Sequence, residues 1–265
     1  MIHIKFGSVP VLVVCSAKSA KQVLKIQDLA FCSRPKFFAQ QKISYNCMDM
    51  VFSPYNDYWR EVRKITNIHL FSLKKVQSFG PVREEEVYRM IKKITRLESC
   101  SGDPAVNLSE IVMNFASSII CRVAFGKRYE EEGSEMRRFG ELTKTAQALL
   151  TTFFVSDYFP LFSWVDKLSG LMNRLYTTFK DLDSFYQEVI DEHLDRNMMK
   201  GTDVEDDDIL DVLIRLKEDK SCSVDFQWDH IKALLTAQDI DLDCLPGVTM
   251  HKKKALYLVP KTYAI

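Results

Sequence analysis

The sequence predicts a mainly α-helical fold with a small amount of β-structure. Two segments carry most of this prediction: residues 81–97 place their apolar side chains along one stripe, and residues 107–125 are apolar in nearly every direction. Two short apolar runs, residues 3–6 and 10–14, flank a Gly-Ser pair and are typical of two strands joined by a turn. With 265 residues, 46% of them hydrophobic, the chain could form one large domain or two small ones.

Helical patterns begin directly after the two strands. Residues 19–27 are predicted to be a helix, and a second helix is predicted to begin shortly before Trp59. Residues 81–97 have acidic side chains at the start and basic ones at the end, which suits the helix dipole. The apolar stripe of this helix is made of Val87, Met90, Ile91, Ile94 and Leu97.

The helix expected over residues 107–125 is predicted to lie inside the protein, because its apolar side chains cover nearly all directions. Polar residues such as Asn114 and Arg122 interrupt the apolar stretch, which is also too short for a membrane span. Gly126 is the expected end of this helix, because glycine readily adopts the left-handed conformation of a C-terminal cap.

The remaining pattern is again helical, with a β-hairpin at the end. Helices are predicted over residues 134–154, 165–196, 209–218 and 228–236, and a hairpin over residues 248–259. The acidic run at residues 205–208 lacks the alternation and the glycine turn of a calcium-binding EF-hand loop. We therefore predict a solvated loop there, with Asp208 as the N-cap of the following helix.

Several function classes have no support in the sequence. The 36 basic residues balance the 36 acidic ones, which gives no electrostatic argument for nucleic-acid binding. The glycine motifs of dinucleotide, nucleotide and serine-hydrolase sites do not occur. Seven cysteines without a C-x-x-C pair argue against a disulfide framework, a zinc site or covalently attached haem, and they suit a reducing compartment. We predict Cys121 to be a small core residue, each of the five histidines to be a surface or satisfied core residue, and no residue to be a metal ligand.

Trp59 and Arg63 are four residues apart at the start of a predicted helix, so their side chains leave the same face. An indole N–H and a guanidinium on one face form a pair of donors suited to a single carboxylate. The alternative is an ordinary cation–π pair on a helix surface.

The sequence around these two residues, SRP at 33–35 and SPYNDYWREVRK at 53–64, closely resembles the plant microsomal cytochrome P450 enzymes, which are haem-thiolate monooxygenases. Further landmarks of that family are PVREEE at 81–86, NLSE at 107–110, AFGKRY at 124–129, SDYFP at 156–160 and LPGVTMHKK at 245–253. In order and spacing they match the first half of such an enzyme, up to about Thr236, and then its last short stretch.

The resemblance implies one domain that is truncated at its N-terminus and internally deleted. Residues 1–236 correspond to the N-terminal part of a cytochrome P450-like domain, and residues 237–265 to its C-terminal β-hairpin segment. Absent are the long central helix, the E-x-x-R helix and the F-x-x-G-x-R-x-C-x-G loop, whose cysteine is the axial iron ligand of the family. We therefore expect an incomplete fold that exposes apolar surface.

The resemblance also implies roles for particular residues. Trp59 and Arg63 match the pair that holds a haem propionate in the family. Phe153, Phe154 and Phe52 match positions around a hydrophobic substrate. Two alternatives stay open for these aromatic residues: they bury a helix end against its neighbours, or they form an exposed apolar patch.

The activity that the resemblance implies is haem-dependent insertion of one oxygen atom into a small hydrophobic plant metabolite, with electrons from NADPH-cytochrome reductase. Because the axial-cysteine loop is absent, we expect the chain as written to be an inactive remnant and assign no catalytic residue. A functional monooxygenase or haem-binding oxidoreductase is one alternative, and a non-catalytic helical interaction protein is another. The family lies on the cytosolic face of the endoplasmic reticulum, whereas this sequence shows no transmembrane anchor and is expected to be cytosolic or loosely membrane-associated.

Overall fold

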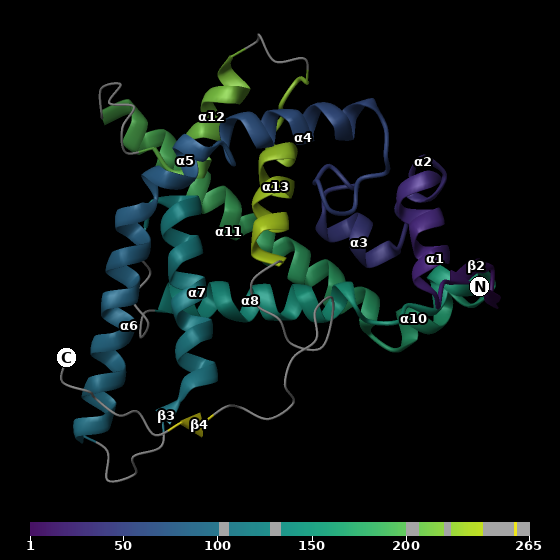
Figure 1. Cartoon of the computed structure of the whole chain (residues 1–265), viewed down its shortest axis with the longest axis horizontal. Helices are drawn as coiled ribbons and strands as arrows, with labels where there is room; N and C mark the ends of the chain where they lie inside the picture. Colours follow the sequence, from purple (N-terminus) through teal and green to yellow (C-terminus); the bar gives the residue numbers. More distant parts are fainter. Residues whose placement is uncertain (101–105, 128–133, 200–206, 220–223, 241–256, 259–265) are drawn as a thin grey trace.

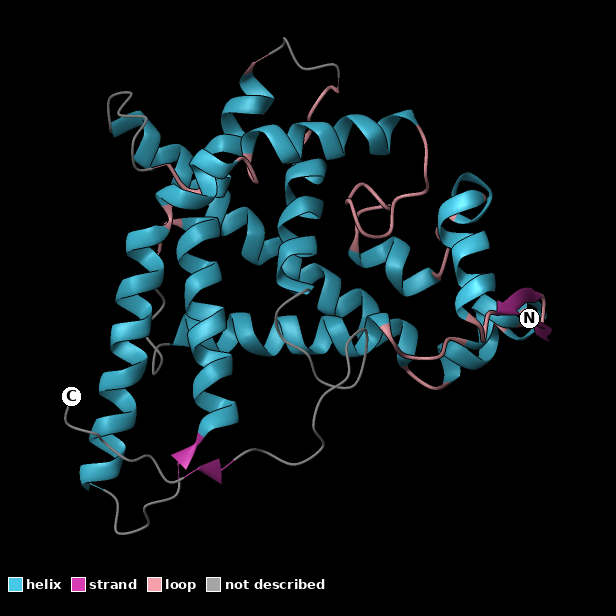
Figure 2. Cartoon of the chain, viewed as in Figure 1, coloured by secondary structure: helices cyan, strands magenta, loops and turns pink. Residues whose placement is uncertain are grey.

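The computed structural model describes residues 1–100, 106–127, 134–199, 207–219, 224–240 and 257–258 (Figure 1). Helices predominate in these segments, and their strands form two separate two-stranded sheets (Figure 2). The prediction of a mainly α-helical fold with a little β-structure is confirmed.

The N-terminal strand–turn–strand unit is present as predicted. Strands β1 (Ile2–Phe6) and β2 (Val9–Val13) pair in antiparallel register. Gly7 in the turn has a φ of +59°, and a Cβ atom there would lie 2.1 Å from the backbone oxygen of Tyr158, so only glycine fits. The predicted helix at residues 19–27 corresponds to two consecutive segments, α1 (Ala17–Lys21) and the wider π-helical turn η1 (Gln22–Ile26). A further short helix, α2 (Asp28–Phe31), follows it.

Five helices follow in the described part of residues 32–127. They are α3 (Phe38–Ile43), α4 (Asp57–His69), α5 (Leu73–Ser78), α6 (Gly80–Cys100) and α7 (Leu108–Phe125). Helices α6 and α7 lie side by side (Figure 1), and Arg122 joins them through ion pairs to Glu86 at 2.8 Å and Glu85 at 2.9 Å. Gly126 ends α7 in the left-handed conformation at φ +61°, as predicted.

Helix α7 is less enclosed than its composition suggests. Ile111, Cys121 and Phe125 are buried, but Val112 is 45% exposed, so the predicted burial on all sides holds for only part of its surface. Among the described residues α7 is long and apolar enough to cross a membrane, and the bent pair Arg138–Tyr158 with Pro160–Leu168 passes the same test as one span. Core helices of soluble proteins meet that criterion too, and α7 packs against α6 and carries the ion-paired Arg122.

The second half of the chain contains α8 (Ser134–Leu150), α9 (Val155–Tyr158), the short 3₁₀ turn η2 (Pro160–Phe162), α10 (Trp164–Leu168), α11 (Leu171–Met199), α12 (Ile209–Glu218) and α13 (Trp228–Ile240). The prediction of one continuous helix over residues 165–196 is wrong, because Gly170 at φ +76° separates α10 from α11. Helix α12 has its predicted bounds, and α8 ends four residues earlier than expected.

The predicted C-terminal hairpin lies largely outside the described residues. Its described part, β4 (Tyr257–Leu258), pairs with β3 (Val106–Asn107), the short strand that leads into α7. A core of buried side chains lies among α4, α7, α8, α11, α12 and α13. Three phenylalanines from α7, α8 and α11 meet there: Phe125, Phe139 and Phe185 form edge-to-face and tilted ring contacts with centroids 5.0–6.3 Å apart.

Candidate functional site

The start of α4 carries the residue pair that the sequence singles out. Asn56 caps the helix by accepting a hydrogen bond from the backbone N–H of Trp59 at 2.8 Å, which satisfies one of the free donors of the first turn. The helix therefore begins just before Trp59, as predicted, and Trp59 and Arg63 lie one turn apart on the same face.

Trp59 and Arg63 interact with each other in the structure. The guanidinium of Arg63 lies 5.0 Å from the centroid of the Trp59 ring, a cation–π arrangement. The indole N–H of Trp59 donates to the backbone oxygen of Met50 at 3.0 Å. Among the described residues the exposed Arg63 has this ring contact and no ion pair, so its N–H groups are the donors that this face offers to a carboxylate.

The loop before α4 fixes the carbonyl group that Trp59 contacts. Three successive residues, Tyr45, Asn46 and Cys47, have φ values of 50°, 61° and 61°, a left-handed run that is costly for residues other than glycine. The buried Asp49 accepts hydrogen bonds from the backbone N–H groups of Val51 and Phe52.

Burial raises the pKa of Asp49 to about 6, against the lowering effect of those backbone hydrogen bonds. Beside this carboxyl group, Tyr58 donates to the Met48 oxygen at 2.7 Å, which ties the loop to α4. The loop that precedes α4 is thus held by its own buried carboxyl group, Asp49, and by hydrogen bonds from Tyr58 and Trp59 of the helix.

The three aromatic residues predicted around a substrate do not share one environment. Phe52 and Phe154 are buried in the core at 8% and 1% exposure, and the Phe154 ring contacts Phe38 with centroids 6.2 Å apart. Phe153 is 55% exposed and stacks on Tyr158 at 4.5 Å. Two of the three are therefore packing residues here, and the third belongs to an exposed aromatic surface.

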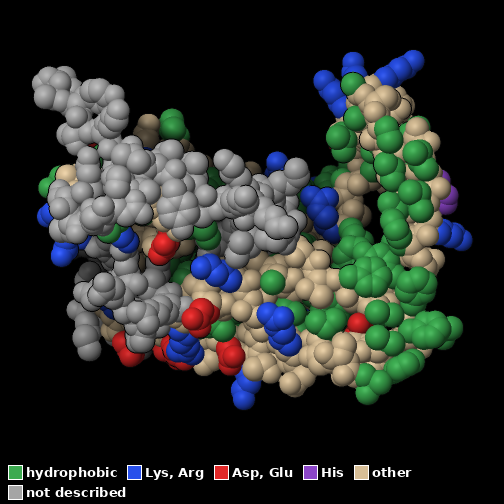
Figure 3. All heavy atoms as spheres, turned by 90° about the horizontal axis from the view of Figure 1, so that it is seen from below, with side chains coloured by type: hydrophobic (Ala, Val, Ile, Leu, Met, Phe, Trp, Pro, Cys, Tyr) green, Lys and Arg blue, Asp and Glu red, His purple; other side chains and the backbone are tan. Residues whose placement is uncertain are grey.

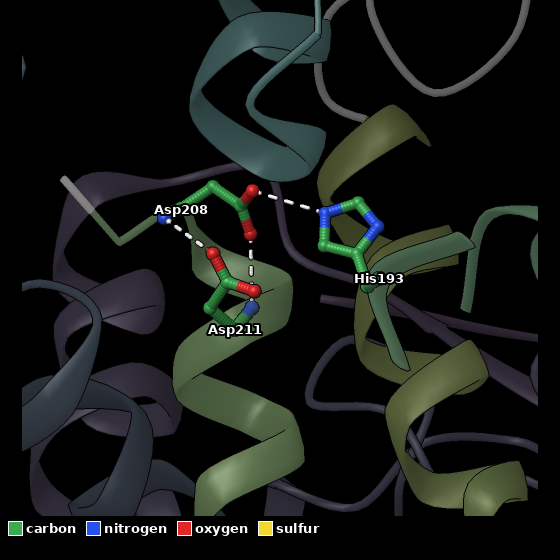
Figure 4. Close-up of side chains that lie close together, drawn as sticks. All are labelled: His193, Asp208 and Asp211. Carbon is green, nitrogen blue, oxygen red and sulfur yellow. Dashed lines mark hydrogen bonds and ion pairs between the residues drawn. The ribbon is translucent and has the colours of Figure 1, made fainter. Parts of the chain in front are cut away.

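A buried charged cluster, which the sequence did not indicate as a unit, connects α11 with α12 (Figure 4). Nε2 of His193 lies 3.0 Å from Asp208 Oδ2, and Nδ1 of the same ring lies 2.7 Å from the Val189 carbonyl oxygen. Arg196 donates to Asp208 at 3.0 Å and to Asp211 at 2.7 Å. The predicted N-cap role of Asp208 is confirmed, since it and Asp211 form a reciprocal capping box.

The same cluster corrects the prediction of a solvated loop at residues 205–208. Asp208 is 2% exposed, and Asp207 is half-buried; the two preceding residues lie outside the described part of the chain. His193, Asp208 and Asp211 have the donor atoms and the proximity of a metal site. However, the Arg196 guanidinium already contacts both carboxylates, so a positive charge stands where a cation would bind, and the cluster is satisfied as an ion-pair network.

A second buried charge also escaped prediction. Lys232 in α13 is 5% exposed and donates to Asp183 of α11 at 2.7 Å, and the Tyr45 hydroxyl donates to the same carboxylate oxygen at 2.9 Å. Burial, followed by the charge of Asp183, raises the pKa of Tyr45 above its ordinary value, so the phenol stays protonated as a donor. The loop before α4 is thereby joined to α11 and α13.

Comparison with known proteins places this architecture in a family. The family model for "Cytochrome P450" matches residues 1–238. The chain is 49% identical over 216 residues to a 6,7,8-trihydroxycoumarin synthase from Pastinaca sativa, covering 81% of this chain and 42% of that protein. It is 44% identical over 236 residues to cytochrome P450 71A1 from Persea americana, covering 89% and 47%.

Solved structures agree on the fold. A zebrafish cytochrome P450 determined with progesterone superimposes with a TM-score of 0.68 at 18% identity, over 89% of this chain and 51% of the other. A structure of a zebrafish cytochrome P450 with abiraterone gives 0.69 at 19% identity, over 91% and 51%. The chain thus spans about half the length of the relatives that it matches. From the family match and these relatives together, we conclude that this chain belongs to the cytochrome P450 family.

Proposed function

We propose that this chain is the N-terminal half of a haem-thiolate monooxygenase domain, joined at residues 237–265 to the short C-terminal segment of the same domain, and that by itself it does not carry out oxygen chemistry. The observation that carries the proposal is that its 265 residues contain no F-x-x-G-x-R-x-C-x-G loop. Haem ligated by a cysteine thiolate supplies the electron density that favours O–O bond cleavage. Without that ligand the remaining residues can contact the cofactor but cannot supply electron density to its iron.

The fit of haem to the residues present is partial. The exposed guanidinium of Arg63, with no ion pair among the described residues, suits a propionate group. Trp59 would hold the same propionate only after exchanging its hydrogen bond to Met50. Of the described cysteines, Cys47 and Cys121 are buried inside the core. These observations support contact with the edge of haem, while the family's axial-cysteine loop is absent from the sequence.

The names of the relatives support a substrate class for the parent enzyme. The matched proteins include a 6,7,8-trihydroxycoumarin synthase, a 5-OH-xanthotoxin synthase from Ammi majus and a strychnine-11-hydroxylase from Strychnos nux-vomica. We infer a parent domain that hydroxylated a small hydrophobic plant metabolite, with NADPH-cytochrome reductase as partner, at the endoplasmic reticulum. Of the three aromatic residues proposed at its substrate site, Phe153 has the largest exposed surface to offer.

The proposal is tested by carbon monoxide binding. We expect the purified chain, supplied with haem, reduced and exposed to carbon monoxide, to lack the red-shifted Soret band of thiolate-ligated haem. With reductase and NADPH it should yield no hydroxylated product from a coumarin. The full-length Pastinaca sativa relative, treated in the same way, is the positive control. A red-shifted band together with NADPH-dependent product from the 265-residue chain would refute the proposal.

A separate prediction concerns the propionate contact. Arg63→Ala is expected to weaken haem binding by about tenfold, the loss of one charge-assisted hydrogen bond. Lys64→Ala is the matched control, because it removes an equal charge from the next residue, which is also exposed. Haem titration followed by absorbance measures both dissociation constants. Equal affinities for the two variants would exclude Arg63 from the haem contact.

A further inference from the structure

One peptide group in the loop before α4 is hydrogen-bonded at both ends. The Met50 carbonyl oxygen accepts from the indole N–H of Trp59 at 3.0 Å. The N–H of the same peptide group belongs to Val51 and donates to Asp49 Oδ2 at 3.2 Å. Hydrogen bonds in such a chain polarise one another, and a charged end strengthens them. An ionised Asp49 therefore makes the Met50 oxygen a stronger acceptor for the indole.

The carboxyl group of Asp49 is buried beside backbone donors. It is 1% exposed, and within the described part of the chain it forms no ion pair. Besides the N–H of Val51, it accepts from the N–H of Phe52, which lies 3.1 and 3.2 Å from its two oxygens. A side-chain carboxylate that binds N–H groups two and three residues ahead stabilises a local turn. Asp49 therefore fixes the turn that contains the Met50–Val51 peptide.

The loop on either side of this peptide has anchors of its own. Tyr58 of α4 donates to the Met48 oxygen at 2.7 Å, and Arg34 donates to the Val51 oxygen at 3.2 Å. Residues 45–47, which precede the turn, have left-handed φ values of 50–61°, a conformation that is costly for residues other than glycine. The Met50–Val51 peptide can thus turn away from Trp59 while the two anchors hold the rest of the loop in place.

Trp59 connects this turn with the donors that α4 offers to a carboxylate. The Arg63 guanidinium lies 5.0 Å from the Trp59 ring centroid, and the Tyr55 ring lies against the same indole with centroids 5.5 Å apart. While Met50 accepts its N–H, Trp59 is a platform for Arg63 and not a second donor. The Met50 oxygen and a propionate are therefore competing acceptors for one indole N–H, and weakening the first favours the second.

We propose that Asp49 is a positioning residue: its ionised carboxylate holds the Met50–Val51 peptide against the indole N–H of Trp59, and its neutral form releases that N–H to a propionate. This inference rests on the proposed function, because that function supplies the carboxylate as a haem propionate. The first step, exchange of the indole N–H away from the Met50 oxygen, takes place in the chain without haem and is measured there.

The protonation state of Asp49 changes in an accessible pH range. Burial raises its pKa to about 6, so it is ionised at pH 7.5 and mostly neutral at pH 5. Burial also raises the pKa of Cys47 and Tyr58, the two groups on which its charge acts, so both stay neutral over this range. His230 of α13, whose ring lies 5.6 Å from that of Tyr58, has a pKa lowered by burial and is the other group that gains a proton in acid. Two cations complete the surroundings: Arg34, which binds the Val51 oxygen, and Lys36, whose charge acts on Cys47.

The chain without haem tests the first step. It has three tryptophans, so the ¹⁵N-labelled protein gives three indole N–H signals in NMR spectra, and Trp59→Phe identifies the signal of Trp59. Between pH 7.5 and pH 5 we expect this signal to shift with a midpoint near 6 in the parent chain and in His230→Gln. In Asp49→Asn it should stay near its low-pH position throughout. A Trp59 signal that does not move in the parent, or whose shift is abolished by His230→Gln, overturns the proposal.

Haem titration at pH 7.5 tests the second step. Asp49→Asn is expected to bind haem about fivefold more tightly than the parent, because the Met50 oxygen loses the charge-assisted bond that makes it a strong competitor. In a Trp59→Phe background the same substitution should leave haem affinity unchanged, since no indole N–H remains to be released. Equal affinities of the parent and Asp49→Asn, or an equal gain in both backgrounds, overturns the proposal.

Uptake of haem by apolar surface is a separate process that needs its own control. Hydrophobic side chains gather at the end of the molecule that carries the N-terminal strands (Figure 3), and Leu24 and Leu29, which follow those strands, are exposed. Haem dimethyl ester has no free carboxylate, so it should bind the parent and Asp49→Asn with equal affinity. A gain with the ester as large as the gain with haem overturns the proposal. Failure here leaves the carbon monoxide result untouched, because that experiment reports the ligand of the iron and not the propionate contact.

Discussion

Replacing Asp208 by alanine is expected to lower the free energy of unfolding by about 3–5 kcal/mol, the cost of breaking a buried ion pair by removing one partner. Asp208 is 2% exposed and accepts hydrogen bonds from His193 and Arg196. It also caps α12 by accepting from the backbone N–H of Asp211 at 2.9 Å. Alanine would leave the buried His193 ring without its carboxylate partner and remove the cap.

The effect should depend on pH in a defined direction. Burial raises the pKa of Asp208, but the hydrogen bond and charge of His193, together with Arg196, outweigh burial and hold the pKa below its ordinary value. A carboxyl group with a lowered folded pKa stabilises the fold fully above its unfolded pKa of about 3.9, and this contribution is lost as the pH falls below that value. Asp208→Ala should therefore differ most from the parent chain near neutral pH and least in acid.

Urea unfolding at pH 7 and at about pH 2.5, below the unfolded carboxyl pKa of about 3.9, measures both effects when followed by tryptophan fluorescence. Arg60→Ala is the control, because Arg60 belongs to an exposed pair with Asp57 and should change the midpoint very little. If Asp208→Ala and Arg60→Ala unfolded at the same urea concentration at pH 7, the cluster would contribute nothing to stability.

Phe125→Ala is expected to destabilise the protein by about 3–5 kcal/mol, through lost apolar burial and the cavity left in the core. Phe125 is fully buried at the last position of α7, and its ring meets Phe139 and Phe185 edge to face at 6.0 and 6.3 Å. The three rings belong to α7, α8 and α11, so one truncation loosens the contact of three helices at once.

Leu161→Ala is the matched control for this truncation, because Leu161 is 90% exposed and loses little burial. Phe125→Leu should fall between the two, since it keeps most of the apolar volume. The midpoints of urea unfolding order the three variants. A Phe125→Ala midpoint as high as that of Leu161→Ala would show that the aromatic cluster is not part of the cooperative core.

Local patterns sufficed for the elements whose signals lie within a few residues. The apolar stripe and charge order at residues 81–97 predicted α6, Gly126 marked the end of α7, and Asp208 marked the start of α12. A helix and its caps depend on interactions between residues no more than four or so apart, so the sequence carries that information directly. Gly170 was missed because a single glycine within a long helical pattern is often tolerated.

The spacing of Trp59 and Arg63 likewise predicted that their side chains share one face of α4. It did not predict the hydrogen-bond partner of the Trp59 indole N–H. That N–H reaches Met50 because the left-handed residues Tyr45–Cys47 and the buried Asp49 shape the loop before α4. The separation of Phe153 from Phe154, one exposed and one in the core, depends in the same way on the course of the chain after α8.

By itself, then, the sequence determined the helical class, most of the long helices, the caps at Gly126 and Asp208, and the family landmarks, because each follows from periodicity or from a short motif. Only the tertiary structure decided which distant charges meet, as Asp183 with Lys232 and Arg122 with Glu86, and that none of residues 1–31 is buried. These outcomes depend on the packing of elements far apart in the chain. A side chain's neighbours across the core follow from where whole helices lie, and no pattern of spacing within one segment records that position.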